Sequence, residues 1–178
     1  MSLPEPVVAP AFVVVSGLPG TGKSFFCRKL AEKAPFAIIE SDAMRKVLFP
    51  SPGYSADESA RLFMALHGLV EELLQNGISV LFDATNLVEH HRERLYRIAD
   101  KNGAKLILVR VEAPSEVVYQ RLKARKNGSD PDSKSDADRE VYERMKPTAG
   151  KIQRGHFVVN TARDISPVID KVVRMARR

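Results

Sequence analysis

A short glycine-rich stretch between two apolar segments constrains this chain more than any other feature of its sequence. Residues 12–16 read FVVVS, a continuous apolar run that predicts a buried strand. Apolar residues resume at Phe25, in a segment whose pattern predicts a helix over residues 23–33. Between the two lies SGLPGTGKS, which fits the pattern G-x-x-x-x-G-K-S from Gly17 to Ser24. The stretch therefore predicts a strand, a tight glycine loop and a helix in immediate succession.

This loop has the form of a phosphate-binding loop. Its glycines let the backbone curl so that N–H groups point inward at a phosphate, and the helix that follows directs its positive end at the same anion. We expect Lys23 to contact the β- and γ-phosphates of a nucleoside triphosphate, and the Ser24 hydroxyl to bind Mg²⁺. A dinucleotide fingerprint does not fit, because the three glycines come in the wrong order. The ATP-binding residues predicted from the motif are Gly17, Leu18, Pro19, Gly20, Thr21, Gly22, Lys23 and Ser24.

The rest of the chain alternates predicted strands with predicted helices. Apolar runs at residues 36–40, 79–83, 105–112 and 156–160 are too continuous for half-solvated strands and predict a sheet that is buried on both faces. Helical patterns cover residues 56–75, 87–101, 114–126 and 166–178. Strands that alternate with helices favour right-handed crossovers and a parallel sheet. We therefore expect an α/β fold with a doubly wound, parallel five-stranded sheet, in one domain over residues 1–178.

Composition and charge agree with a folded protein that is not embedded in a membrane. Of the 178 residues, 44% are hydrophobic and 28% are charged, close to the globular average. No apolar run approaches the ~20 residues that span a bilayer, and the first ten residues do not resemble a signal peptide. Cys27 is the only cysteine, so no internal disulfide forms, and we expect a cytoplasmic protein. A net charge of +6 suits a phosphorylated ligand but does not by itself indicate nucleic acid.

Polar residues follow two of the predicted strands, at the edge where parallel α/β sheets bind their ligands. We expect Asp42, after the second strand, to orient and deprotonate an acceptor hydroxyl, and Arg45 to bind a polar or anionic part of the acceptor. Alternatively, Asp42 caps a short helix and pairs with Arg45. Asp83 ends the run VLFD and is either a carboxylate that binds Mg²⁺ or a turn residue before a helix. Asn86 either caps the next helix or contacts the acceptor.

Two arginines, a polar segment and a threonine complete the predicted site. Arg121 and Arg125 share one helix face. They either form a solvated basic surface or neutralise the transferred phosphoryl group, an effect worth up to ~10³–10⁵ in rate. The segment NGSDPDSKSD, residues 127–136, is either part of a lid over residues 121–146 or an idle surface loop. Thr161, after the last strand, either lines the adenine pocket or belongs to an ordinary loop.

Four sets of motifs occur in a fixed order: SGLPGTGKS, ESDAMRK, FDATNLVEHHRERL, and RLKAR followed by SDADREVYERM. Together they resemble the motifs of the small P-loop kinases grouped with the 5′-hydroxyl polynucleotide kinases and the bacterial predicted ATP kinases. The resemblance implies a sheet of the nucleotide-kinase type, with Asp42 as the carboxylate that activates the acceptor. It also implies Arg121 or Arg125 as an arginine of the lid, and a role for Asp83 in organising the metal or the acceptor.

The motifs and the resemblance together predict a kinase that uses ATP and Mg²⁺ to phosphorylate a hydroxyl of a small molecule. One alternative is a 5′-hydroxyl polynucleotide kinase, which acts on the ends of nucleic acids. Another is a nucleotide-dependent switch that has no acceptor. Neither a membrane nor an obligate protein partner is implied.

Overall fold

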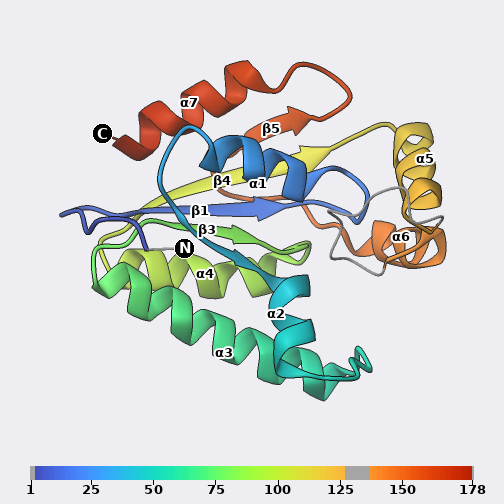
Figure 1. Cartoon of the computed structure of the whole chain (residues 1–178), viewed down its shortest axis with the longest axis horizontal. Coiled ribbons are helices and arrows are strands. Elements are labelled where there is room, and N and C mark those ends of the chain that lie inside the picture. The colour runs from blue at the N-terminus through green and yellow to red at the C-terminus, as the bar shows by residue number, and fades with distance from the viewer. Residues whose placement is uncertain (1–2, 127–136, 178) are drawn as a thin grey trace.

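The computed structural model describes residues 3–126 and 137–177, and its centre is a parallel sheet (Figure 1). The strands lie in the order β2-β3-β1-β4-β5, and all neighbouring pairs are parallel. This arrangement confirms the α/β fold and the parallel five-stranded sheet expected from the sequence. The strands are β1 (Ala11–Ser16), β2 (Ala37–Glu40), β3 (Val80–Asp83), β4 (Lys105–Glu112) and β5 (Phe157–Asn160).

Helices connect the strands, and most of them lie where the sequence pattern predicts them. The exceptions are α2, which was expected only as an alternative, and α6 with the 3-10 turn after it. Helices of seven or eight residues are too short to show a clear periodic apolar pattern. In the described residues, no helix is long and apolar enough to cross a membrane. The helices are α1 (Lys23–Ala31), α2 (Ser41–Leu48), α3 (Ala56–Gln75), α4 (Glu89–Lys101), α5 (Ser115–Lys126), α6 (Arg139–Met145) and α7 (Ser166–Arg177), with the 3-10 turn over Lys146–Thr148.

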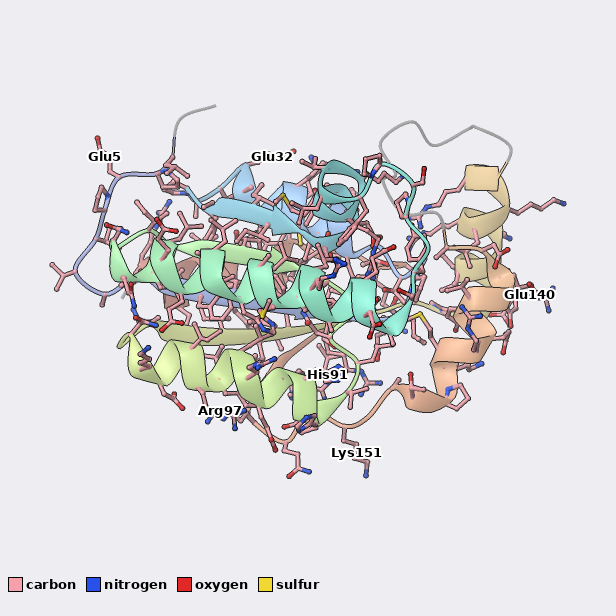
Figure 2. The ribbon with its side chains drawn as sticks, turned by 90° about the horizontal axis from the view of Figure 1, so that it is seen from below. Glu5, Glu32, His91, Arg97, Glu140 and Lys151 are labelled. Atoms are coloured by element: carbon pink, nitrogen blue, oxygen red, sulfur yellow. The ribbon has the colours of Figure 1, made fainter. Side chains whose placement is uncertain are left out.

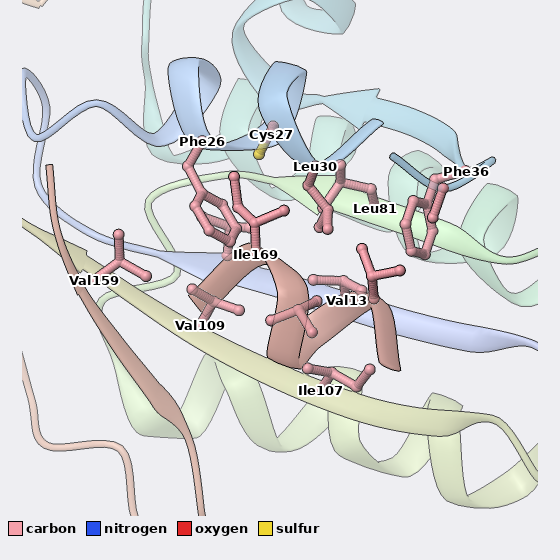
Figure 3. Close-up of a cluster of buried hydrophobic side chains, with 14 of the residues drawn as sticks. Val13, Phe26, Cys27, Leu30, Phe36, Leu81, Ile107, Val109, Val159 and Ile169 are labelled. Atoms are coloured by element: carbon pink, nitrogen blue, oxygen red, sulfur yellow. The ribbon is translucent and has the colours of Figure 1, made fainter. Parts of the chain in front are cut away.

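Helices cover both faces of the sheet, which explains the continuous apolar runs in its strands. Figure 3 shows the first face, where Phe26 and Leu30 of α1 and Ile169 of α7 pack around Val13 and Val109. On the second face α3 and α4 lie side by side (Figure 2). All six residues of β1, the central strand, are consequently buried.

The strand order decides which segments meet at the edge where the strands end, which we call the carboxyl edge. The glycine loop follows β1 and therefore lies in the middle of this edge. The segments after β4 and β5 lie on one side of the loop, and the segments after β2 and β3 lie on the other. Because ligands of open α/β sheets bind beyond the carboxyl ends of the strands, these five segments define the candidate site.

Candidate active site

The glycine loop needs its glycines for two separate reasons. Gly20 and Gly22 have φ angles of 79° and 94°, a region that side chains rarely adopt. Gly20 also lies so close to α5 that an added Cβ would be 2.8 Å from Cγ1 of Val118. A Cβ on Gly17 would collide with the backbone carbonyl oxygen of Val111 in β4. The loop is thus wound tightly and pressed against its neighbours, which fixes its backbone N–H groups.

Lys23, Ser24 and Asp83 form a buried polar group at the start of α1. Asp83 is 5% exposed, and its Oδ2 accepts a hydrogen bond of 2.7 Å from Ser24 Oγ. Lys23 Nζ donates to the carbonyl oxygen of Leu18 at 3.2 Å. Burial lowers the pKa of Lys23 and raises the pKa of Asp83, and the charge of each residue opposes the shift of the other. A hydroxyl beside a carboxylate is the kind of oxygen ligand set that Mg²⁺ prefers, so Ser24 and Asp83 fit a metal site.

A cavity of about 380 Å³ opens around this group at the carboxyl edge. It brings together most of the residues that the sequence predicts for the site. The strand order determines on which side of the glycine loop each of them lies. Asp42 and Asp83 come from the side of β2 and β3. Arg121, Arg125 and Thr161 come from the side of β4 and β5. The glycine loop, with Lys23 and Ser24, lies between the two groups.

Arg121 of α5 donates hydrogen bonds to the glycine loop and to the segment after β5, and we call this set of contacts the clamp. Its Nη1 donates to Thr161 Oγ1 at 2.8 Å, and its Nη2 donates to the Thr161 carbonyl at 3.1 Å. The same guanidinium reaches the carbonyl oxygens of Gly20 and Thr21 at 3.4 and 3.3 Å. Thr161 Oγ1 in turn donates to the Thr21 carbonyl at 2.5 Å. Arg121 and Thr161 therefore fix the glycine loop relative to α5 and to the segment after β5.

Arg45, expected at the acceptor, is held by another part of the fold. It is 7% exposed, forms an ion pair with Glu58, and donates from Nη2 to Ser59 Oγ at 3.2 Å. Its guanidinium also lies 4.8 Å from the ring centroid of Tyr54. Asp42 lies in the first turn of α2, where the N-cap is Glu40 and no side chain caps the helix. Arg45 therefore joins α2 to the start of α3, while Asp42 faces the cavity.

Asn86, the other residue expected at the acceptor, connects the segment after β3 to β1 by hydrogen bonds. Its φ is 45°, it is 8% exposed, and its Nδ2 donates to the carbonyl of Val15 at 2.8 Å. Its own carbonyl accepts hydrogen bonds from Ser16 Oγ, at 2.9 Å, and from Arg92. Among the described residues, the lining of the cavity includes neither Arg45 nor Asn86.

Sequence reasoning missed Arg92, which is 1% exposed. This arginine also donates to the carbonyl of Lys151 at 2.8 Å and pairs with Glu89. It thereby connects the segment after β3 to the segment that leads into β5. The available signal was its place on the apolar stripe of its helix, three residues before the buried Leu95.

The lid expected over residues 121–146 is described in part, since residues 127–136 lie outside the described residues. Its flanks, α5 and α6, share a small apolar cluster of Val118, Leu122 and Tyr142. Leu18 of the glycine loop packs against this cluster. The described parts of the lid region are thus anchored directly to the phosphate-binding loop.

Comparison with known proteins places the chain in a family. A family model described as an AAA domain matches residues 12–152, from the first strand of the sheet to the segment before β5. The chain belongs to this family. As a member of the AAA-domain family it is a P-loop protein related to kinases, which confirms the family expected from the motifs.

The following three similar proteins share 30% or less of their sequence with this chain. A UPF0200 protein of Saccharolobus solfataricus is 27% identical over 156 residues, which cover 82% of this chain and 81% of that protein. The L-seryl-tRNA(Sec) kinase of Methanococcus maripaludis is 30% identical over 113 residues, 61% of this chain and 44% of that protein. Among solved structures, this chain is similar to the Mycobacterium tuberculosis APS kinase in complex with AMPPNP and APS, with a TM-score of 0.67 and 21% sequence identity. The match covers 98% of this chain and 100% of that one. This last likeness confirms that the sheet is of the nucleotide-kinase type.

Proposed function

We propose that the protein is a kinase that uses ATP and Mg²⁺ to phosphorylate a hydroxyl group of a small molecule. The observation that supports this best is the presence of Asp42 in the same cavity as Lys23 and the Ser24–Asp83 pair. A nucleotide-binding switch needs the loop, the lysine and the metal ligands. It does not need a further carboxylate on the side of the cavity opposite Arg121 and Arg125.

The donor half of the reaction is assigned to the glycine loop and to the residues that hold it. Backbone N–H groups of the loop and the Lys23 ammonium bind the β- and γ-phosphates, because both point positive charge at one place. Ser24 and Asp83 are the residues that would hold Mg²⁺, which when bound supplies positive charge to the phosphate oxygens. Arg125 faces the same cavity and is assigned to the transferred group.

The acceptor half is assigned to Asp42. Its carboxylate accepts the proton of the acceptor hydroxyl while the hydroxyl oxygen forms a bond to the γ-phosphorus. The bond between that phosphorus and the β–γ bridging oxygen breaks, and ADP leaves with the bonding electrons. General base catalysis of this kind contributes about 10²–10⁴-fold to the rate.

The proposal is tested by measuring ADP release with a panel of sugars, nucleosides, aminoglycosides and 5′-hydroxyl oligonucleotides. Mass spectrometry of the acceptor then shows which compound gains a phosphate. Asp42→Asn should lower kcat about 10²–10⁴-fold and leave the Kd for AMPPNP unchanged, since the base acts only in transfer. Asp57→Asn, in the exposed first turn of α3, is the matched control and should behave as wild type. ADP release that no acceptor stimulates and that Asp42→Asn does not alter would overturn the assignment and favour a switch.

A further inference from the structure

Asp42 and Arg45 stand three residues apart on α2, the helix that brings Asp42 to the cavity. Side chains at this spacing are neighbours on a helix surface, so a carboxylate and a guanidinium placed there attract each other. In this structure, however, Arg45 is paired with Glu58 of α3. Two carboxylates therefore compete for one guanidinium, and one of them is the residue assigned to the acceptor hydroxyl.

Three contacts hold the Arg45 guanidinium against α3 and the loop before it. The guanidinium pairs with Glu58, donates from Nη2 to Ser59 Oγ at 3.2 Å, and lies 4.8 Å from the ring centroid of Tyr54. The side chains of Arg45 and Glu58 are only 8% and 10% exposed, so water screens their attraction little. The guanidinium is consequently bound on the α3 side of α2.

Glu58 is itself fixed by the start of α3. Its backbone N–H donates to Oγ of Ser55, the N-cap residue, at 3.1 Å. Its side-chain Oε2 accepts a hydrogen bond of 2.6 Å from the N–H of Gly53. A side chain that is already held in one position loses less freedom when it binds a partner. Glu58 is thus a preorganised partner for Arg45, which favours it in the competition with Asp42.

The partner of Arg45 matters because Asp42 already lies in the field of Lys23. Burial lowers the pKa of Lys23, and the charges of Asp83 and Asp42 oppose that shift. A guanidinium bound directly to the Asp42 carboxylate would make it a weaker base and would occupy an oxygen that the acceptor hydroxyl needs. Transfer is therefore favoured when Arg45 is held elsewhere.

Resting on the proposed kinase function, we propose that Glu58 is a positioning residue that keeps the Arg45 guanidinium off Asp42. The Asp42 carboxylate is then left to take the proton of the acceptor hydroxyl. Among the described residues, the lining of the cavity includes neither Glu58 nor Arg45, so Glu58 acts through Arg45 and not on the substrate. When Glu58 is removed, the guanidinium turns along α2 and pairs with Asp42.

The kinetic test is a rescue experiment with the acceptor that the panel of compounds identifies. Glu58→Gln should lower kcat about tenfold, because ion pairing weakens the base, while the Kd for AMPPNP stays unchanged. Adding Arg45→Met to Glu58→Gln removes the competing guanidinium and should restore kcat to within about threefold of the wild type. Adding Lys46→Met instead removes a cation four residues after Asp42 and should restore nothing.

Two kinetic results would overturn the inference. If Glu58 only supports the fold, the double variant with Arg45→Met is at least as impaired as Glu58→Gln. If Arg45 binds the acceptor, Arg45→Met alone raises the KM of the acceptor. Glu71→Gln is the matched control, because it breaks the ion pair of α3 with Lys101 of α4 and should keep the wild-type kcat. Should Glu58→Gln not fold, Glu58→Asp keeps the charge on a shorter side chain and should show a smaller loss with the same rescue.

A crystal structure of Glu58→Gln tests the inference without any acceptor. The Arg45 guanidinium should lie within hydrogen-bond distance of the Asp42 carboxylate. A guanidinium that stays beside residue 58 would overturn the inference and leave the proposed kinase function intact. A guanidinium beside Asp42, together with no transfer to any acceptor by the wild type, would overturn the kinase function and support the competition for Arg45.

Discussion

Replacement of Thr161 by valine tests the clamp on the glycine loop, because the two side chains have nearly the same shape. The Thr161 hydroxyl donates to the Thr21 carbonyl at 2.5 Å and accepts from Arg121 at 2.8 Å. Thr161 is 8% exposed, so little water is available to replace these bonds. A buried hydrogen bond contributes about 1 kcal/mol and a charge-assisted one about 1.5–3 kcal/mol. Because Arg121 keeps its other acceptors, we expect Thr161→Val to lower the free energy of unfolding by about 2 kcal/mol.

Urea denaturation and a thermal scan measure this loss directly. For a chain of this length, about 2 kcal/mol corresponds to a fall in Tm of roughly 4–8 °C. Calorimetric titration with AMPPNP should also show about tenfold weaker binding, because the clamp holds the loop that contacts the phosphates. Thr148→Val is the control, since its hydroxyl donates to the Met145 carbonyl at 2.7 Å in an exposed turn, and its cost should stay within about 0.5 kcal/mol. Equal Tm values for the two variants would refute the reasoning.

Two further predictions concern stability. Gly20→Ala forces a side chain into a left-handed backbone and 2.8 Å from Val118, so it should cost about 1–3 kcal/mol in urea denaturation. Val118→Ala loses buried contacts of its own, so it serves as the reference: added to it, Gly20→Ala should still cost stability, but less than in the wild type. Burial first, and then nearby cationic side chains, lower the pKa of His67 from 6.5 to about 4. Protonation therefore favours the unfolded state, and stability is lost as pH falls from about 6.5 toward 4. Between pH 7.5 and pH 5 the free energy of unfolding should fall by about 1 kcal/mol, a value already halved for solvent screening. In His67→Phe the free energy of unfolding should change less over this pH range. The same pH dependence in His67→Phe and in the wild type would contradict the prediction.

The strands and their burial were predictable because the sheet is covered on both faces. A strand buried on both sides has no polar face, so its sequence is a continuous apolar run that stands out between helical patterns. The observed bounds of β1 and β3 differ from the predicted ones by one residue at one end. α2 was expected only as an alternative, since its eight residues contain Asp42 and Arg45, which indicate a functional segment as readily as a helix.

The polar core of the site was predictable for a geometric reason. Lys23 and Ser24 are fixed by the loop motif. Asp83 ends β3 and Asp42 follows β2, and the carboxyl ends of these strands meet at one edge. The parallel sheet alone therefore brings these residues into one cavity. Two further residues that line the cavity, Phe25 and Glu40, were harder to predict, because they belong to a helix and a strand whose sequences show nothing unusual. Only their place beside the cavity distinguishes them from ordinary surface residues.

The arginines show why a basic residue near a predicted site is weak evidence for a ligand. Loops at the carboxyl edge leave the strand ladder, so their buried carbonyl oxygens need donors from elsewhere. Arg92 and Arg121 meet this need by donating to loop carbonyls, and Arg45 forms an ion pair with Glu58, whose side chain is 10% exposed. Such contacts span up to about a hundred positions of sequence, so no local pattern indicates them. The described contacts of Arg45 and Arg121 accordingly hold parts of the fold together, which the presence of a basic residue in the sequence does not reveal by itself.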